Sequence, residues 1–302
     1  MSVSVKSLLV CAACLCGLSS IASAQSKLTV RGGYAFSNMD YPYAFDLFDQ
    51  SQINSDYGEG VFGHIGYSND TIFGSFGGEV SFTYHRLTNS DSYSDGGRCT
   101  TYDIISLSHV LCMEGAETSS TTRFGQFRLM AKQKLAGSGL EIMGGIGVLD
   151  FSSDSSGMMF FPGESSSQSR SNDYTGVGLV VGTRKEFVIS GATTLQLEGF
   201  AGAYTGDRDL TVNGEWVGNV GELSQTNSQK VYSLDLSASV AVPVQAIGAG
   251  SKFEFGLAYA RIFNVMDTTN YNTTTLGIVG PTGSLNDDVD AFSVFVGLQI
   301  PM

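Results

Sequence analysis

The stretch YSLDLSASVAVPV (residues 232–244) decides the fold class, because its apolar residues fall on every second position. Every even-numbered residue from Tyr232 to Val244 is apolar, while the odd-numbered positions up to Ser239 carry serine or aspartate. Successive side chains of a β-strand point to opposite faces, so the alternation predicts a strand with one apolar and one polar face. The stretch exceeds the about 9 to 11 residues that a tilted strand needs to cross a bilayer.

The same alternation recurs along the whole chain, in segments separated by alternately short and long connections. The predicted strands are ten in number and cover residues 27–36, 60–68, 71–87, 121–135, 140–151, 173–187, 193–205, 229–244, 252–263 and 289–301. The short connections are Asn69-Asp70, Ala136 to Gly139, Val188 to Ala192 and Gln245 to Ser251. The long polar connections cover 37–59, 88–120, 152–172, 206–228 and 264–288, and we expect them to be mobile and exposed to water.

Short turns on one side and long polar loops on the other are typical of outer-membrane barrels. The sequence therefore predicts an all-β protein with a single transmembrane antiparallel up-and-down β-barrel of about ten strands, within a range of eight to twelve. Twelve would result if DIISLSHVL (103–111) added a hairpin to the barrel. A soluble β-sandwich also alternates apolar and polar residues, but it requires neither long strands nor regularly alternating connections.

The first 24 residues have the three parts of a secretory signal peptide. Lys6 provides the basic start, an apolar run follows from Leu8 to Leu18, and Ala22-Ser23-Ala24 precedes the predicted cleavage site. The alternatives are an uncleaved anchor helix, for which the run is short, and a lipoprotein signal using a cysteine of this segment. We therefore divide the chain into a signal peptide (1–24) and a barrel (25–302), located in the cell outer membrane.

Net charge and the final strand indicate which partners the chain takes. The formal net charge of −13 argues against nucleic acid, whose binding relies on cationic surface. A barrel in this location contacts outer-membrane lipids and lipopolysaccharide. The strand that runs to Met302 suits the barrel-assembly machinery, although an aromatic residue is usual at this end. Self-association is left open.

Two cysteines, Cys99 and Cys112, remain after removal of the signal peptide. Both lie in one predicted polar loop of an exported protein, where disulfides form and persist. We predict a disulfide between them that holds this loop. The alternative is a reactive thiol with His109 as a nearby base.

If the apolar residues of each strand face lipid, the polar residues that alternate with them face the lumen. The predicted lumen-lining residues are Arg31, His64, Glu79, His85, Arg128, Lys132, Glu141, Arg184, Glu186, Glu198, Asp235 and Glu254. Charges enclosed in a narrow interior form paired networks, because an unpaired charge away from water costs several kcal/mol. The alternative is that they line a conduit and select ions.

Small and aromatic residues extend this interpretation. The lumen phase carries many small residues, such as Gly182, Gly256 and Ser239, which leave a narrow water path or permit strong coiling of the strands. Aromatic residues near the predicted strand ends suit girdles at the membrane interfaces. These are Tyr34, Phe36, Tyr67, Tyr84, Phe187, Tyr204, Tyr232, Phe253, Tyr259 and Phe263.

Catalytic and metal motifs are weak, and we predict no enzyme, no cofactor and no metal site. His85 precedes Asp91 and Asp95 in the following loop, but this spacing matches no protease motif. No HExxH, GxSxG or P-loop pattern occurs. The acidic run that contains Asp287, Asp288 and Asp290 has residues suited to calcium, but a solvated loop end is the favoured explanation.

The segment DYTGVGLVVGTRKEFVISGATTLQLEGFAGAYTGD (173–207) resembles the paired strands of the Legionella-type major outer-membrane porins. FGQFRLMAKQKLAGSGLEIMGGIGV (124–148) and FEFGLAYARIFNVMDT (253–268) have similar placement. The usual proline after the GxG is missing, since Val180 and Val181 occupy that region. The resemblance implies a pore-forming outer-membrane protein and transfers no individual functional residue.

Two main hypotheses for the function follow, with a surface hydrolase that uses His85 as a third. The first is a porin-like barrel for passive passage of small solutes or ions. The alternative is a closed structural or adhesive barrel whose extracellular loops bind surfaces.

Overall fold

The structure is a computed structural model, and it describes most of the chain after the predicted signal peptide. The described residues are 26–37, 58–73, 76–93, 98–104, 107–113, 115–161, 164–216, 219–267, 272–274, 277–279 and 286–302. The predicted signal peptide and Asp95 lie outside them.

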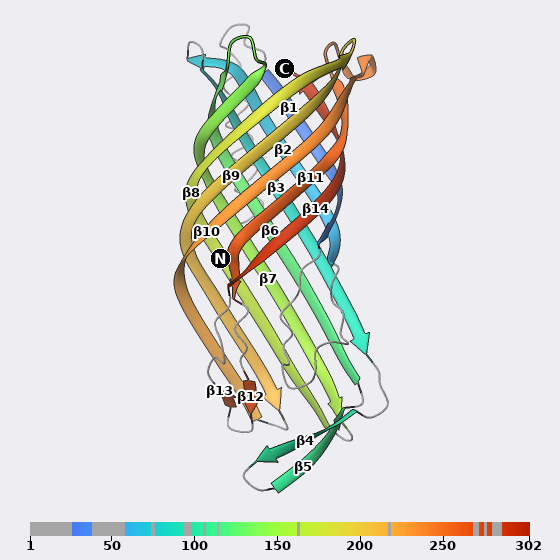
Figure 1. Cartoon of the computed structure of the whole chain (residues 1–302), viewed down its shortest axis with the longest axis vertical. Helices are drawn as coiled ribbons and strands as arrows, with labels where there is room; N and C mark the ends of the chain where they lie inside the picture. Colours follow the sequence, from blue (N-terminus) through green and yellow to red (C-terminus); the bar gives the residue numbers. More distant parts are fainter. Residues whose placement is uncertain are drawn as a thin grey trace.

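Ten strands form a closed antiparallel barrel, in the order β1-β14-β11-β10-β9-β8-β7-β6-β3-β2 (Figure 1). The barrel strands are β1 (Ser26–Ser37), β2 (Gly58–Phe73), β3 (Phe76–Tyr93), β6 (Gly115–Lys134), β7 (Leu140–Phe161), β8 (Glu164–Ser190), β9 (Thr193–Trp216), β10 (Asn219–Pro243), β11 (Lys252–Asp267) and β14 (Asn286–Pro301). Two small hairpins lie outside the barrel sheet, β4 (Arg98–Ile104) with β5 (Leu107–Met113) and β12 (Asn272–Thr274) with β13 (Gly277–Val279). A short 3-10 helix, η2 (Gln245–Ile247), follows β10. The fold prediction is confirmed.

β1 closes the barrel by pairing with β2 on one side and with β14 on the other. Lys27 lies opposite Pro301, and the backbone N–H of Met302 donates to the carbonyl of Ser26 at 2.9 Å. The two ends of the barrel therefore meet where the short turns lie, at the top of Figure 1. This is the periplasmic end.

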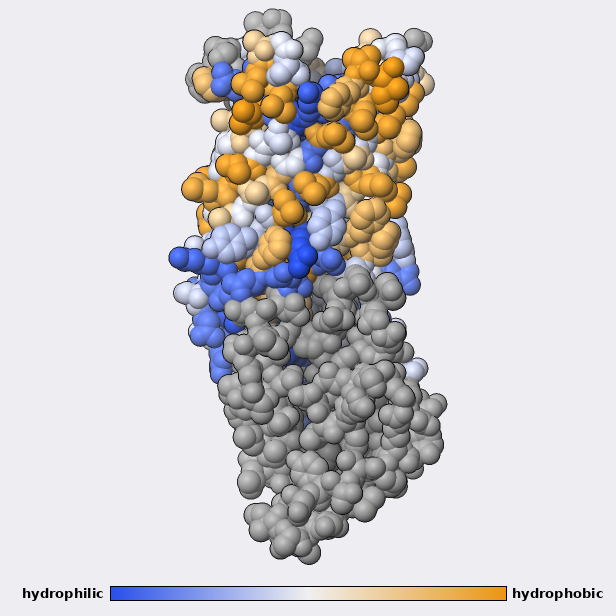
Figure 2. Space-filling model, viewed as in Figure 1, coloured by the Kyte–Doolittle hydropathy of each residue, from blue (hydrophilic) through white to orange (hydrophobic). Residues whose placement is uncertain are grey.

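The outward face of the barrel is apolar over the part near the short turns. Leu179, Val181 and Ile146 are among the large hydrophobic side chains that are more than half exposed. Figure 2 shows the apolar residues covering this part and a hydrophilic band where they end. Such a belt suits lipid, since a closed barrel satisfies its backbone hydrogen bonds internally. Among the described residues, no helix is long and apolar enough to cross a membrane.

The strands continue far beyond this belt, which corrects three of the predicted loops. In the predicted loop 88–120, β3 and β6 stay paired as far as Tyr93 and Ala116. Residues 152–161 and 164–172 are paired strand, with Ser153 opposite Asn172 and Phe161 opposite Glu164. Residues 206–216 and 219–228 are likewise paired in β9 and β10. The sequence hid these strands because polar residues dominate both of their faces, apart from a small inward cluster of Leu210, Val212 and Leu223. We call the part of β3 and β6–β10 that lies beyond the apolar belt the extension.

The predicted loop 88–120 contains a hairpin that stays outside the barrel. β4 and β5 pair only with each other, so the barrel has ten strands and not twelve. The predicted turn at Asn69-Asp70 is also displaced, because β2 continues to Phe73, which pairs with Phe76.

Candidate functional site

The guanidinium of Arg31, on β1, reaches across the barrel interior to carboxylates of β9 and β11. Its Nη1 donates to Glu198 at 2.9 Å, while Nε and Nη2 donate to the two carboxylate oxygens of Glu254 at 3.0 and 2.8 Å. The Glu254 side chain has no exposed surface, and that of Arg31 is 5% exposed. Ser239 also donates to Glu254, at 2.5 Å. Hydrogen bonds from several strands thus compensate these buried charges.

Arg184, on β8, extends the same network toward β3 and β7. Its Nη1 and Nη2 donate to Glu79 at 2.8 and 3.0 Å, and Nη1 also contacts Glu141 at 3.4 Å. Its Nε donates to Glu198, the carboxylate that also binds Arg31. Glu198 therefore joins the two arginines into one network that spans the lumen.

Two further ion pairs lie on the inward face. Arg128 donates to Asp235 at 2.5 Å, and its guanidinium lies 4.6 Å from the ring centre of Phe200. Lys132 donates to Asp70 at 2.6 Å. A cation over an aromatic face is attracted by the ring quadrupole, so the Phe200 ring stabilises the charged guanidinium of Arg128.

Glu186 and His64 form hydrogen bonds outside this network, although His64 is the direct cross-strand partner of Arg31. Glu186 is at the periplasmic rim, where it pairs with Lys252 at 2.8 Å and its side chain is 46% exposed. A ring nitrogen of His64 lies 2.9 Å from the hydroxyl of Thr83. A role of the predicted set in ion passage stays a prediction.

A row of buried aromatic rings follows the inner wall of the barrel on the extracellular side of Arg31, and the sequence analysis missed it. Phe62, His85, Phe124, Phe151 and Tyr174 are successive cross-strand partners from β2 to β8. All are between 1% and 6% exposed. The ring centres are 5.1 Å apart between Phe62 and His85 and 4.4 Å apart between His85 and Phe124. Phe295 joins this aromatic row through its contact with Phe62 at 5.6 Å.

His85 is buried inside the barrel. Its ring is stacked on Phe124 and is 2% exposed. Neither ring nitrogen has a hydrogen-bond partner within the part of the chain that the structure describes. His85 therefore belongs to the filling of the lumen.

The inward glycines make room for rings, and this corrects the predicted position of Tyr204. A Cβ on Gly202 would lie 2.5 Å from the Tyr204 ring, and one on Gly182 would lie 2.3 Å from the Phe200 ring. Tyr204 is 2% exposed inside the barrel, so it takes no part in an interfacial girdle. The sequence indicates this inward position, because Tyr204 lies an even number of residues from the inward Glu198 and an odd number from the outward Leu197 on the same strand.

The ion pairs and the rings together fill the lumen of the membrane-spanning part. A continuous water-filled channel would expose the side chains that line it. Those of Arg31, Glu198 and Glu254 are at most 6% exposed, and the rings of the aromatic row are buried. Eight strands enclose a space that side chains just fill, whereas sixteen to eighteen leave an aqueous channel. In this ten-stranded barrel, side chains fill the interior as they do in eight-stranded barrels.

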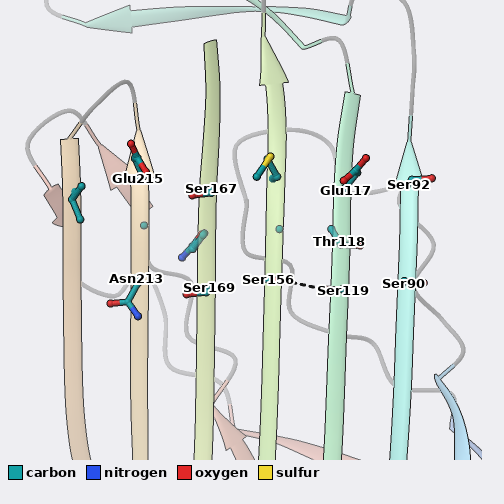
Figure 3. A pocket seen from close by; sticks show the side chains of 15 residues that line it. Ser90, Ser92, Glu117, Thr118, Ser119, Ser156, Ser167, Ser169, Asn213 and Glu215 are labelled. Carbon is teal, nitrogen blue, oxygen red and sulfur yellow. Dashed lines mark hydrogen bonds between the residues drawn. The ribbon is translucent and has the colours of Figure 1, made fainter.

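The extension carries a groove of about 620 Å³, lined mostly by residues with polar side chains. Hydroxyl, amide and carboxylate side chains of β3 and β6–β9 line most of it, and Figure 3 shows them on neighbouring strands. The labelled residues are Ser90, Ser92, Glu117, Thr118, Ser119, Ser156, Ser167, Ser169, Asn213 and Glu215. The hydroxyls of Ser119 and Ser156 lie 2.9 Å apart. Most of these residues share the outward phase of the lipid-facing residues on the same strands.

The hairpin outside the barrel brings the two cysteines opposite each other. Cys99 on β4 and Cys112 on β5 are direct cross-strand partners in the backbone register. The disulfide itself stays a prediction.

Comparison with solved structures finds outer-membrane proteins over nearly the whole chain, at low identity. The outer-membrane protease OmpT from Escherichia coli is 7% identical, and the match covers 94% of this chain and 99% of that one, with a TM-score of 0.48. A major outer membrane protein from Thermus thermophilus is 14% identical, with 92% and 99% covered and a TM-score of 0.34. The translocator domain of the autotransporter NalP from Neisseria meningitidis is 12% identical, with 98% and 95% covered and a TM-score of 0.38. The likeness concerns the fold alone.

The prediction that the chain is not an enzyme is contradicted by this comparison. The first of the three structures is a protease, so outer-membrane barrels include enzymes and the fold gives no ground for the exclusion. At 7% identity the match assigns no activity to this chain.

No family model matches the chain, and no curated protein matches its sequence. The resemblance to the Legionella-type porins therefore rests only on the segments quoted above.

Proposed function

We propose that this protein is a closed outer-membrane barrel that holds its extension above the membrane as a surface for binding. The observation that carries the proposal is the filled lumen, in which charged and aromatic side chains from opposite strands contact one another and are almost entirely buried. Passage of solutes was the first hypothesis from the sequence. The buried network favours the alternative.

The location is part of the proposal. The apolar belt and the closed barrel suit a lipid bilayer. The signal peptide predicted at residues 1–24 would supply export, and barrel-assembly machinery would insert the chain.

Strand length supports a role for the extension. β8, β9 and β10 contain 27, 24 and 25 residues, whereas about 9 to 11 residues suffice to cross the bilayer. The additional residues hold the groove well beyond the apolar belt. Its hydroxyl and amide groups suit hydrogen bonds to a hydrophilic partner such as the sugars of a polysaccharide.

Conductance in a planar lipid bilayer tests whether the lumen is closed. The refolded protein, with folding verified by its heat-dependent shift on an SDS gel, should give no current steps. A conducting porin in a parallel bilayer verifies that the assay works. Discrete and reproducible steps from this protein would overturn the proposal.

Adhesion tests the role of the extension separately. In a matched variant, residues 154–171 are replaced by Asn-Gly, which closes the hairpin between the paired Ser153 and Asn172. Cells that display the complete protein should adhere to a panel of immobilised polysaccharides, and cells with the shortened variant should lose this adhesion. Equal adhesion by both would refute a binding role for the groove, whatever the conductance shows.

A further inference from the structure

Two arginines face each other on the outer surface of the barrel, at the boundary between the apolar belt and the extension. Arg86 on β3 and Arg123 on β6 are direct cross-strand partners. Both side chains are exposed and share the outward phase of Phe82 and Phe127, which are also partners. Side chains in this relation have Cβ atoms about 4.5 to 5.5 Å apart.

Among the described residues, this arginine pair has no acidic partner. Like charges directly opposite on a sheet are destabilising. Within the described residues, neither guanidinium forms a hydrogen bond or an ion pair. Glu59 and Asp154 lie diagonally across the adjacent strands, and neither forms an ion pair with these arginines. An anion bound between the two guanidinium groups would remove the repulsion.

Along the barrel axis, the outward residues change from aromatic on the belt side of the arginine pair to hydroxyl-bearing on the extension side. On the belt side lie Phe82 and Tyr84, whose rings are stacked with centres 6.5 Å apart. The Phe82 ring covers Gly125, which is the partner of Tyr84. On the extension side, hydroxyl residues follow as cross-strand pairs, Thr88 with Thr121 and then Ser90 with Ser119.

This order matches the layers of a phosphorylated glycolipid in the outer leaflet. Acyl chains would lie against the Phe82 and Phe127 rings, the phosphate would lie at the arginine pair, and the sugars would lie against the hydroxyl groups. A guanidinium binds phosphate through two parallel charge-assisted hydrogen bonds, which makes arginine well suited to this anion. We propose that the outer face of β3 and β6 is a binding site for the phosphate group of lipopolysaccharide.

Native mass spectrometry of the purified protein in detergent tests the site. The probes are lipid A carrying its phosphates, the same lipid after dephosphorylation, and inorganic phosphate. The wild-type protein should bind phosphorylated lipid A, and the R86Q/R123Q variant should bind it at least ten-fold more weakly. Dephosphorylated lipid should bind both proteins equally, and inorganic phosphate at equal concentration should not displace the lipid.

Lys230→Gln is the matched control. Lys230 is an exposed cation on the outer face of β10. It lies two residues from Tyr232 toward the extension, as Arg86 lies two residues from Tyr84, but its cross-strand partner is the uncharged Thr205. K230Q should bind lipid A as the wild type does. An equal loss in K230Q and R86Q/R123Q, or no loss in a double variant that still shows the heat-dependent gel shift, would overturn the proposal. Full displacement by inorganic phosphate would identify a site for free anions instead.

Discussion

The fit between single glycines and aromatic rings determines how the lumen is filled. Phe200 occupies the space beside Gly182 on the adjacent strand, and the Phe295 ring lies against Gly256 in the same way. In close-packed interiors, a volume change of even one methylene group affects stability. The two inward glycines are therefore part of the packing of the lumen.

Gly182→Val should destabilise the barrel, because its Cβ would lie 2.3 Å from a carbon of the Phe200 ring. Overpacking of this kind costs about 1 to 3 kcal/mol. The urea midpoint of unfolding in lipid vesicles should fall, and adding Phe200→Ala should restore part of it. Gly144→Val is the control, since nothing lies within 4 Å of its Cβ position on the exposed face. Equal effects of G182V and G144V would contradict the glycine–ring fit.

Arg31→Met should destabilise the barrel more strongly, because Glu254 and Glu198 would lose a buried partner. Breaking a buried ion pair on one side costs about 3 to 5 kcal/mol. The same urea titration measures the loss, and the double variant R31M/E254Q should recover part of it. Lys252→Met removes a partly exposed pair at the rim and should cost about 1 kcal/mol or less. A small effect of R31M would show that water reaches the network.

The elements of the extension form strands although the apolar cluster that supports them, Leu210, Val212 and Leu223, is small. Backbone pairing continues without a register shift from the barrel into β7 and β8 until close to Phe161. Hydroxyl–carboxylate bonds join neighbouring strands, as between Ser171 and Asp154 at 2.9 Å and between Ser228 and Asp207 at 2.8 Å. Each strand is thus stabilised by neighbours that begin in the membrane.

The hairpin of β4 and β5 should contain a disulfide between Cys99 and Cys112. Direct partners in an antiparallel pair have Cα atoms about 4.5 or 5.5 Å apart, within the range that a disulfide spans. Mass spectrometry of a digest without reductant should find the linked peptides, and alkylation should modify neither cysteine until reduction. Because the hairpin does not pair with the barrel, Cys99→Ser should leave the heat-dependent gel shift unchanged. Alkylation of both cysteines without reductant would refute the disulfide.

At the scale of the whole molecule, the membrane-spanning barrel should fold without the tip of its extension. The variant in which Asn-Gly replaces residues 154–171 keeps every strand of the apolar belt and both ends of the barrel closure. We expect it to insert into membranes and to retain the shift on heating in SDS. Loss of that shift, with aggregation during refolding, would show that the extension is needed to close the barrel.

Alternation along each strand is a local property, and it determined the fold class, the lipid-facing residues and the number of strands of this protein. It also placed Arg31, Glu198 and Glu254 in the inward phase. The tertiary structure alone decided which inward residues meet, because pairing register brings together residues far apart in the sequence, as with Arg31 and Glu254. The same register aligned Phe62, His85 and Phe124 in one row. Whether a barrel of this width is open or filled depends on contacts between side chains that are distant in the sequence. The alternation along a single strand does not predict these contacts.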